Sequence, residues 1–466
     1  MTLANKILKT SAIYSLLSYL SFFFGIVGQI LLARLIAPEF FVPFVTVLAF
    51  IEIIYAFGSI GLNNVLLTYQ KEPKIFGTSF FILSFLAIFL FFLSVGASLF
   101  FLGKEFFEII VLLSIAKSVS MYSVLFASFL EKDFKHSFVG VLEIISKIIS
   151  VTVAVYLAYT GVKTLSLVYK EFIYSILFTG VLFIIVTKYI EYKFDINTAR
   201  KVFNFSFKFF VLRLVEVSIK NVPILFLSKF SGNTSAYFER AYYLGGLTNT
   251  FFSPVTSKIS YAFYAKLKDQ LYRVKKGVYL NLNITFRLIL PITILIIFFS
   301  QEIILFIYGE KWFETGDYLQ YLAGLFLFMP LFAILKFFLI SHNHIKLVLK
   351  VRMYSIITLI IGIFYIYYFS HEFKYIAIIF SAIYFFSFIY LLIITNKKLD
   401  LDLKHLFLKP LIIVFLITPI LFIFDFHWVM NSFIYLLLYT LLLGVYEKEN
   451  TKEVFKILKG AKSNKP

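Results

Sequence analysis

The stretch TSAIYSLLSYLSFFFGIVGQILLARL (residues 10–35) decides the fold, because no charged side chain interrupts it before Arg34. A helix that crosses a bilayer needs about 20 mostly apolar residues. Lys6 and Lys9 precede the stretch, as basic residues precede a cleaved signal peptide, but a signal-peptide core spans only about 7–15 apolar residues. This run is longer, so we predict that it forms the first of several transmembrane helices.

The composition extends this prediction to the whole chain. Of the 466 residues, 61% are hydrophobic and 15% are charged, whereas soluble domains have roughly 45–50% apolar and about 25% charged residues. This composition disfavours a soluble enzyme and excludes a disordered chain, and the apolar residues suffice for about 14 spans. We predict an all-α polytopic membrane protein with spans at 10–35, 42–68, 75–102, 106–130, 136–160, 165–187, 204–229, 234–261, 278–300, 317–341, 348–369, 373–395, 409–424 and 429–446.

The basic residues indicate how these spans are oriented. Of the 44 Lys and Arg residues, 29 lie in segments on the N-terminal side of the membrane, six in the opposite loops and nine inside spans. Cytoplasmic loops collect Lys and Arg, so we predict a plasma (inner) membrane protein with both termini in the cytoplasm. This distribution accounts for most of the net charge of +19 without a nucleic-acid partner. The chain has no cysteine, and its six scattered His residues show no metal-ligand spacing.

A polar stretch at residues 188–201 divides the chain. We predict two parallel-repeat six-helix lobes around a central cavity, at residues 1–190 and 191–395. A two-helix hairpin (396–446) and a basic cytoplasmic tail (447–466) would follow. Parallel repeats of this kind recur in secondary transporters. No G-x-x-x-x-G-K-[ST] motif occurs, which excludes ATP-driven transport within this chain.

Charged residues inside the predicted spans point to transport. A charge at the bilayer centre costs about 2.5–3.5 kcal/mol on insertion scales, and such groups face a cavity or a partner. The basic ones are Lys117, Lys147, Lys170, Lys208, Arg213, Lys220, Arg240, Arg287 and Lys336. The acidic ones are Glu52, Glu108, Glu143, Glu171, Glu216 and Glu239. The interior is therefore expected to be wet, with more basic than acidic groups.

Several motifs are similar to those of one transporter family. They are LLARLIAPEFF (31–41), FGSIGLNNVLL (57–67), FERAYYLGGL (238–247), AKLKDQLYRVKKG (265–277) and, after Pro291, IYGEKWFETGDYLQYLA (307–323). Over residues 1–395 the chain resembles the polysaccharide transporter family, the lipid-linked repeat-unit flippases of the multidrug/oligosaccharidyl-lipid/polysaccharide exporter superfamily. It departs from the family at Ala37 and Val42, where Gly is usual, and at Tyr264, where Pro is usual.

The resemblance implies a flippase rather than an enzyme. It would move an isoprenoid-(pyro)phosphate-linked oligosaccharide to the outer leaflet by alternating access, for O-antigen, capsule or exopolysaccharide. Membrane lipids, a polysaccharide polymerase and chain-length machinery are the implied partners. Cationic side chains would ease the passage of the phosphate through charge-assisted hydrogen bonds. We predict a substrate path through Lys117 and Lys147 near the middle of their spans, Arg213 and Lys220 two turns apart on one helix, and Arg240 near the outer end.

A purely structural interpretation remains open for these residues. Glu143 and Lys147 are four positions apart, as are Glu216 and Lys220, and Arg213 precedes Glu216 by three, so each set could neutralise itself locally. Lys170 is expected to pair with Glu171, and Arg34 to stabilise a helix end. No cofactor is indicated. Coupling to H⁺ or Na⁺ through Glu143 or Glu216 is a further hypothesis.

Three other functions stay open. A multidrug antiporter of the same superfamily would favour an acidic cavity for cationic drugs, whereas the predicted interior is mainly basic. A lipid II flippase would need similar headgroup chemistry. A membrane glycosyltransferase or polymerase would need carboxylates on a sizeable outer loop, but the first outer loop holds one acid, Glu39.

Overall fold

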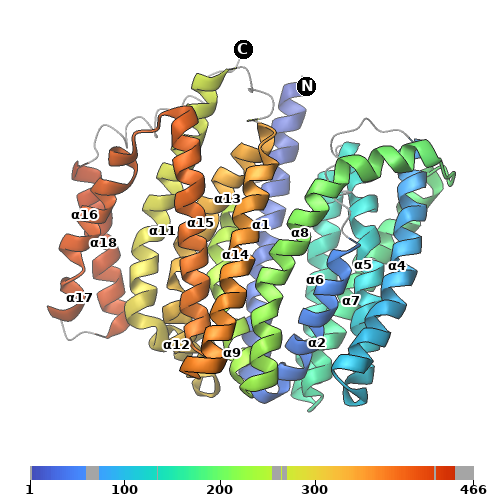
Figure 1. Cartoon of the computed structure of the whole chain (residues 1–466), viewed down its shortest axis with the longest axis horizontal. Coiled ribbons are helices and arrows are strands. Elements are labelled where there is room, and N and C mark those ends of the chain that lie inside the picture. Colours follow the sequence, from blue (N-terminus) through green and yellow to red (C-terminus); the bar gives the residue numbers. More distant parts are fainter. Residues whose placement is uncertain are drawn as a thin grey trace. The chain divides into compact units, whose positions relative to one another are not determined.

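The computed structural model describes residues 3–58, 73–133, 135–253, 264, 270–423 and 427–446. All regular secondary structure in these ranges is helical, which confirms the all-α fold (Figure 1). Twelve helices in the described ranges are long and apolar enough to cross a membrane. The predicted basic tail 447–466, most of the motif 57–67 and the first part of the connection 265–277 lie outside the described residues.

The helices follow the predicted spans closely. They are α1 (Leu3–Leu35), α2 (Pro38–Ala56), α4 (Pro73–Phe101), α5 (Phe107–Lys132), α6 (His136–Tyr159), α7 (Lys163–Val186), α8 (Ile196–Phe230), α9 (Thr234–Ser253), α11 (Leu271–Ile307), α12 (Thr315–Tyr321), α13 (Ala323–Ser341), α14 (Ile345–Tyr365), α15 (Tyr375–Leu399), α16 (Lys409–Ile417), α17 (Ile420–Ile423) and α18 (Trp428–Tyr446). Helices α8 and α9 stand at the seventh and eighth predicted spans but are more polar than the other twelve. The extra charges of α8 contribute to the site described below.

The chain forms two compact units. Unit 1 comprises Met1–Arg240, Ile307–Phe313 and Arg352–Ile376, and unit 2 comprises Ala241–Phe306, Glu314–Val351 and Ala377–Pro466. Each unit thus combines segments that are far apart in the sequence. The division into two lobes agrees with the predicted fold class.

Helix α2 lies inside unit 1. It packs along α8 and also contacts α4, α5 and α7, while α1 packs on α6, α6 on α7, and α5 on both α4 and α7. Gly28 of α1 faces Val151 of α6 so closely that a Cβ at this position would lie 2.7 Å from the Val151 side chain, which explains the close approach of these helices. Since α2 contacts several helices at once, a charge in the middle of this helix lies close to its neighbours.

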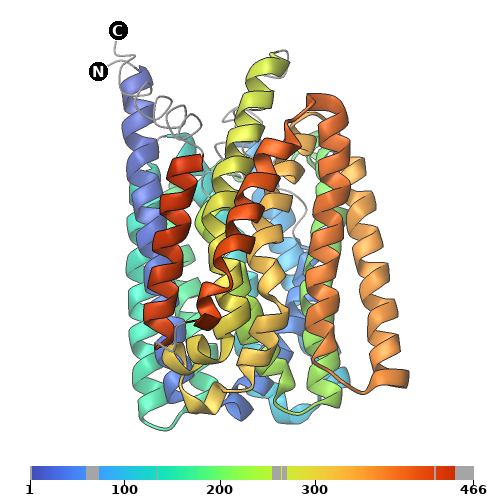
Figure 2. The ribbon, with the colours of Figure 1, turned by 90° about the vertical axis from the view of Figure 1, so that its left-hand side faces the viewer.

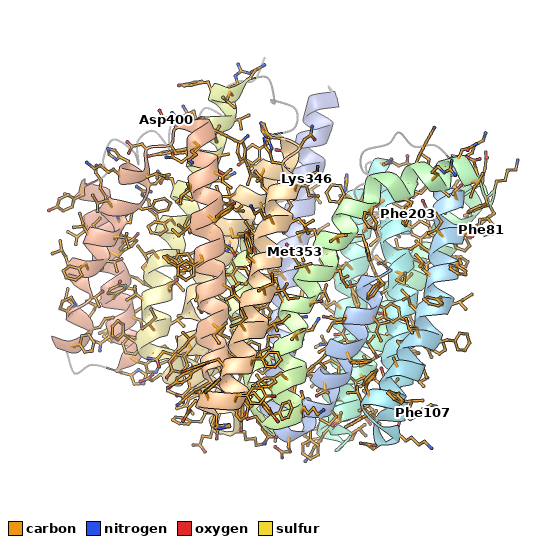
Figure 3. The ribbon with its side chains drawn as sticks, in the orientation of Figure 1. Phe81, Phe107, Phe203, Lys346, Met353 and Asp400 are labelled. Carbon is orange, nitrogen blue, oxygen red and sulfur yellow. The ribbon has the colours of Figure 1, made fainter. Side chains whose placement is uncertain are left out.

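The outer faces of the helices are apolar. Phe81 on α4, Phe107 on α5 and Phe203 on α8 are exposed (Figure 3). Exposed aromatic side chains on long apolar helices suit contact with lipid, because burial in hydrocarbon removes their surface from water. Lipid contact on these faces leaves the interior as the place for polar chemistry.

In unit 2 the guanidinium of Arg287 joins α11 to the segment that leads into α16. It donates to the carbonyl oxygen of His405 at 2.9 Å and to those of Leu406 and Asn283 at 3.4 Å. The Tyr439 hydroxyl of α18 donates to the Arg287 carbonyl oxygen at 3.0 Å. Helices α16 and α18 pack on each other (Figure 2). This in-span arginine therefore has a structural role in holding the C-terminal hairpin.

Candidate functional site

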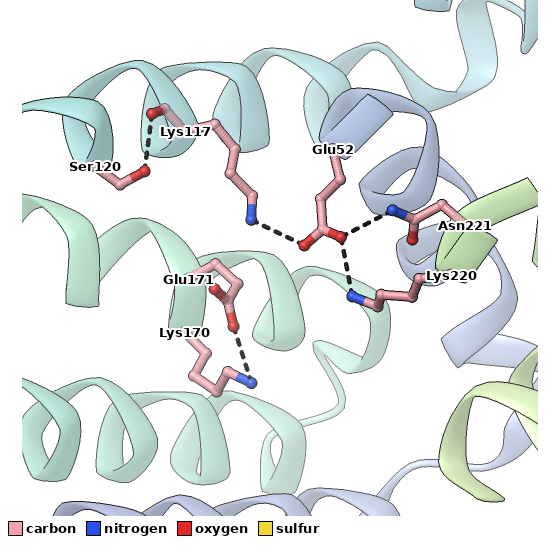
Figure 4. A network of polar contacts seen from close by, with 7 residues as sticks. All are labelled: Glu52, Lys117, Ser120, Lys170, Glu171, Lys220 and Asn221. Carbon is pink, nitrogen blue, oxygen red and sulfur yellow. Dashed lines mark hydrogen bonds and ion pairs between the residues drawn. The ribbon is translucent and has the colours of Figure 1, made fainter. Parts of the chain in front are cut away.

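Glu52 on α2 is the centre of a polar network inside unit 1. The other charged residue of α2 is Glu39, so this helix offers no cation to neutralise it. The two carboxylate oxygens of Glu52 instead bind two other helices (Figure 4). Oε1 lies 3.2 Å from Lys117 Nζ on α5, and Oε2 lies 2.9 Å from Lys220 Nζ and 3.1 Å from Asn221 Nδ2 on α8. One carboxylate therefore ties α2 to both α5 and α8.

More charges surround this network. On α7, Lys170 Nζ lies 3.1 Å from Glu171 Oε1 (Figure 4). Glu171 is close enough to attract Lys117 electrostatically, and Arg213 is close enough to repel it. Arg213 is exposed on α8 and has no ion-pair partner among the described residues. We call this set the central cluster: Glu52, Lys117, Lys170, Glu171, Arg213, Lys220 and Asn221.

The central cluster is electrostatically unbalanced and partly exposed. It contains three ammonium groups and one guanidinium against two carboxylates. The Glu52, Lys117 and Lys220 side chains keep exposed fractions of 21%, 25% and 35%. Each of these side chains therefore keeps part of its surface open to an incoming anion.

A second cluster joins α1 to α6. The Ser21 hydroxyl lies 2.7 Å from Glu143 Oε1 and 2.7 Å from Lys147 Nζ. Lys147 Nζ also lies 3.5 Å from Glu143 Oε1, so the local pair that the spacing suggested does form. A Cβ at Gly25 would lie 3.8 Å from Lys147 Nζ, so this glycine faces the end of the lysine side chain. The positive and negative charges of this cluster balance each other.

A third cluster surrounds Arg240 at the start of α9. Its guanidinium pairs with Glu239, lies 2.6 Å from Gln29 Oε1 on α1, and sits 4.9 Å from the centre of the Phe41 ring on α2. The Arg240 side chain is 3% exposed. All of these partners belong to unit 1. This burial and pairing favour a structural role over a direct substrate contact.

Two further contacts join motifs from the sequence analysis next to the Arg240 cluster. The Trp312 indole donates to the Ala33 carbonyl oxygen at 2.7 Å, and Arg34 Nε donates to the Ile307 carbonyl oxygen at 2.9 Å. The Trp312 ring also packs edge-on against Phe41. Parts of the motifs 31–41, 238–247 and 307–323 thus meet in one cluster. Arg34 does bind a backbone carbonyl, as expected for a structural residue.

The structure therefore groups the five predicted path residues in a different way. Lys117, Lys220 and Arg213 belong to the central cluster, while Lys147 and Arg240 belong to separate clusters. The suggested local pair between Lys220 and Glu216 is wrong. Lys220 binds Glu52, and Glu216 lies 3.7 Å from Arg352 Nε on α14.

Sequence reasoning missed Glu52 and Asn221 as site residues. A signal was available for Glu52, because a carboxylate on an apolar span without any Lys or Arg must find its counter-ion on another helix. Asn221 carried no comparable signal. Its role depends on which side of α8 faces α2, and the neighbouring residues do not decide that.

The chain is similar to one protein family in sequence and to several solved structures in fold. The model of a family described as "Polysaccharide biosynthesis protein" matches residues 31–317. A structure of the lipid II flippase MurJ in an inward closed conformation matches with a TM-score of 0.75 and 16% identity, covering 94% of this chain and 99% of that chain.

Other solved structures share the fold at lower similarity. An inward-facing multidrug resistance MATE family transporter of the MOP superfamily matches with a TM-score of 0.63 and 11% identity, covering 84% of this chain and 99% of that chain. A MOP superfamily transporter from Pyrococcus furiosus, whose binding pocket is described as reversed in polarity, matches with a TM-score of 0.60 and 10% identity over 84% of this chain and 96% of that chain. No curated protein sequence matches the chain.

Proposed function

The chain belongs to the polysaccharide biosynthesis protein family, and from this we propose that it is a flippase for isoprenoid-(pyro)phosphate-linked oligosaccharide repeat units. It would carry them from the cytoplasmic to the outer leaflet of the plasma membrane by alternating access. The observation that carries the proposal is the central cluster, which contains four cationic groups and only two carboxylates.

The physical reason lies in the headgroup. A sugar phosphate that crosses hydrocarbon unaided loses its hydration, and burying an unpaired charge is prohibitively costly. Ammonium and guanidinium groups replace part of that hydration through short charge-assisted bonds to phosphate oxygens. The isoprenoid tail needs no such help, because it can stay in the lipid. A partly exposed cationic site supplies what the headgroup needs.

The remaining parts of the proposal follow from this role. Both termini would lie in the cytoplasm, and membrane lipids, a polymerase and chain-length machinery would be the partners. H⁺ or Na⁺ could drive transport through Glu143 or Glu216. These carboxylates already bind Lys147 and Arg352, so coupling would require the ion pairs to open.

Transport of a labelled lipid in proteoliposomes tests the proposal. The purified protein is reconstituted with an isoprenoid-diphosphate-linked oligosaccharide that carries a fluorescent sugar, and an external quencher reports its sidedness. We expect protein-dependent movement. The double variant Lys117→Gln with Lys220→Gln should lower the rate about 100-fold or more, since it removes two charge-assisted bonds that contribute about 1.5–3 kcal/mol each. Lys104→Gln, at an exposed position outside the cluster, is the matched control and should transport normally.

The same vesicles separate the rival functions. Movement of lipid II but not of the repeat-unit lipid would assign the chain to lipid II transport, in keeping with its structural similarity to MurJ. Uptake of a cationic dye, with no movement of either lipid, would indicate a drug antiporter and refute the proposal.

A further inference from the structure

The Glu52 carboxylate is the shared counter-ion of two ammonium groups. Its two oxygens each contact a different ammonium group, at 3.2 Å and 2.9 Å. We infer that Glu52 is an internal counter-anion, which the phosphate of an incoming headgroup displaces from Lys117 and Lys220, and that this displacement frees α2 from α8. The inference rests on the proposed function and adds how binding would be converted into movement.

The exchange is balanced in charge and hydrogen bonds. A phosphate presents separate anionic oxygens, as the carboxylate does, so each ammonium trades one charge-assisted bond for another. The released Glu52 carboxylate is part-exposed and can be hydrated where it stands. Asn221 loses its acceptor, but its amide can donate to a phosphate oxygen as well. Exchange of this kind is faster than the opening of a buried pair, which would leave uncompensated charges.

The consequence for α2 follows from its contacts with α8. Glu52 contributes two contacts to α8, one charged to Lys220 and one to Asn221. A neutral contact between Thr46 Oγ1 and Ser228 Oγ, 2.7 Å apart, also joins the two helices. Hydrogen bonds to a charged group are worth more than neutral ones. Once Glu52 is displaced, the stronger of these polar contacts between α2 and α8 is therefore lost.

Both helices can bend near these contacts. Pro223 lies within α8, two residues after Asn221, and Pro43 lies within α2. Proline has no N–H to donate, so an intrahelical hydrogen bond is missing at each position and the helix bends more easily there. The released helices thus have sites at which to move.

A reversible cross-link tests the movement. The chain has no cysteine, so Thr46→Cys with Ser228→Cys introduces the only pair, at two positions whose hydroxyl oxygens lie 2.7 Å apart. We expect oxidation to lower flipping of the fluorescent lipid at least tenfold and a reductant to restore it. Ser94→Cys with Ser114→Cys, whose hydroxyl oxygens lie 2.9 Å apart between α4 and α5, is the matched control. Oxidation of the control should leave flipping unchanged.

Direct binding tests the exchange. Farnesyl diphosphate serves as the probe, and its affinity is measured for the monodisperse protein in detergent. Glu52→Gln removes the competing anion, so we expect affinity to rise about tenfold while flipping falls. Glu52→Asp keeps the carboxylate and should restore flipping in part. A purely structural role for Glu52 would predict weaker binding in Glu52→Gln.

The outcomes separate this inference from the proposed function. If the wild type moves none of the lipids, the proposed function fails. If the wild type flips the lipid and the oxidised variant Thr46→Cys with Ser228→Cys flips it equally fast, only the release of α2 is refuted. Unchanged or weaker farnesyl diphosphate binding by Glu52→Gln would refute the counter-anion role, whatever the cross-link shows.

Discussion

Replacing Arg287 with Met should detach the C-terminal hairpin from α11. Among its contacts, the guanidinium donates to the His405 carbonyl oxygen at 2.9 Å and to those of Leu406 and Asn283 at 3.4 Å. A hydrogen bond to a charged group contributes about 1.5–3 kcal/mol, and the long contacts add little, so we expect a loss of about 2–4 kcal/mol. Met fills most of the volume, which keeps the packing term small.

Hydrogen exchange measured by mass spectrometry can detect this detachment. Since about 1.4 kcal/mol corresponds to a factor of ten, the opening equilibrium of α16 and α18 should rise about 30- to 1000-fold. Exchange in α4 and α5 of unit 1 should not change. Arg273→Met, at an exposed position on the same helix, is the matched control. Exchange of α16 and α18 within twofold of the wild type in folded Arg287→Met would show that the guanidinium does not hold the hairpin.

Three further changes test other parts of the structure. Arg213→Ala should leave the melting temperature unchanged, because Arg213 is exposed and without an ion pair in the described residues, but should slow flipping about tenfold; normal flipping would remove Arg213 from the path. Trp312→Phe leaves the Ala33 carbonyl without its donor and should cost about 1–3 kcal/mol of stability; an unchanged denaturation midpoint would contradict this. The pKa of Asp195 lies below its ordinary value of 3.8 because the Thr198 hydroxyl and N–H donate to its carboxylate. The ionised Asp195 carboxylate should therefore stabilise the start of α8 at neutral pH, and this stabilisation should be lost as the pH falls through the lowered pKa of Asp195. In Asp195→Ala, hydrogen exchange of α8 should no longer show this dependence on acid pH.

The sequence was sufficient for the features that depend on long stretches of chain. The helical fold and most span positions follow from apolar runs of about 20 residues, and the family match confirms the resemblance read from the motifs. The pair between Glu143 and Lys147 was also predictable, since residues four apart on a helix face each other. Each of these inferences needs only local information. The orientation in the membrane stays a prediction.

Contacts between helices could not be predicted in the same way. Lys220 had Glu216 one turn away, yet it binds Glu52, because packing turns that side of α8 toward α2. Glu216 in turn meets Arg352, which lies far along the sequence on α14. Spacing along one helix says nothing about which face a neighbouring helix covers. The choice between two chemically equal partners was therefore decided by the fold.

The charge balance of the central cluster distinguishes transport from mere stabilisation. The pairs Lys147–Glu143, Arg240–Glu239 and Arg352–Glu216 each bring a cation against a carboxylate. The central cluster has four cations and two carboxylates. An uncompensated charge within the membrane costs about 2.5–3.5 kcal/mol, so stability alone gives no reason for the excess.

A bound anion supplies that reason. A diphosphate diester carries two negative charges and would neutralise the excess of two, whereas a monophosphate diester would neutralise half of it. We therefore expect isoprenoid-diphosphate-linked sugars to be moved faster than isoprenoid-monophosphate-linked sugars with the same glycan, measured side by side in the proteoliposomes. The difference should shrink when Arg213→Ala lowers the excess by one. Equal rates for both lipids would mean that the excess positive charge does not bind the phosphate groups of the headgroup. The hypothesis that the central cluster is the substrate site would then be wrong.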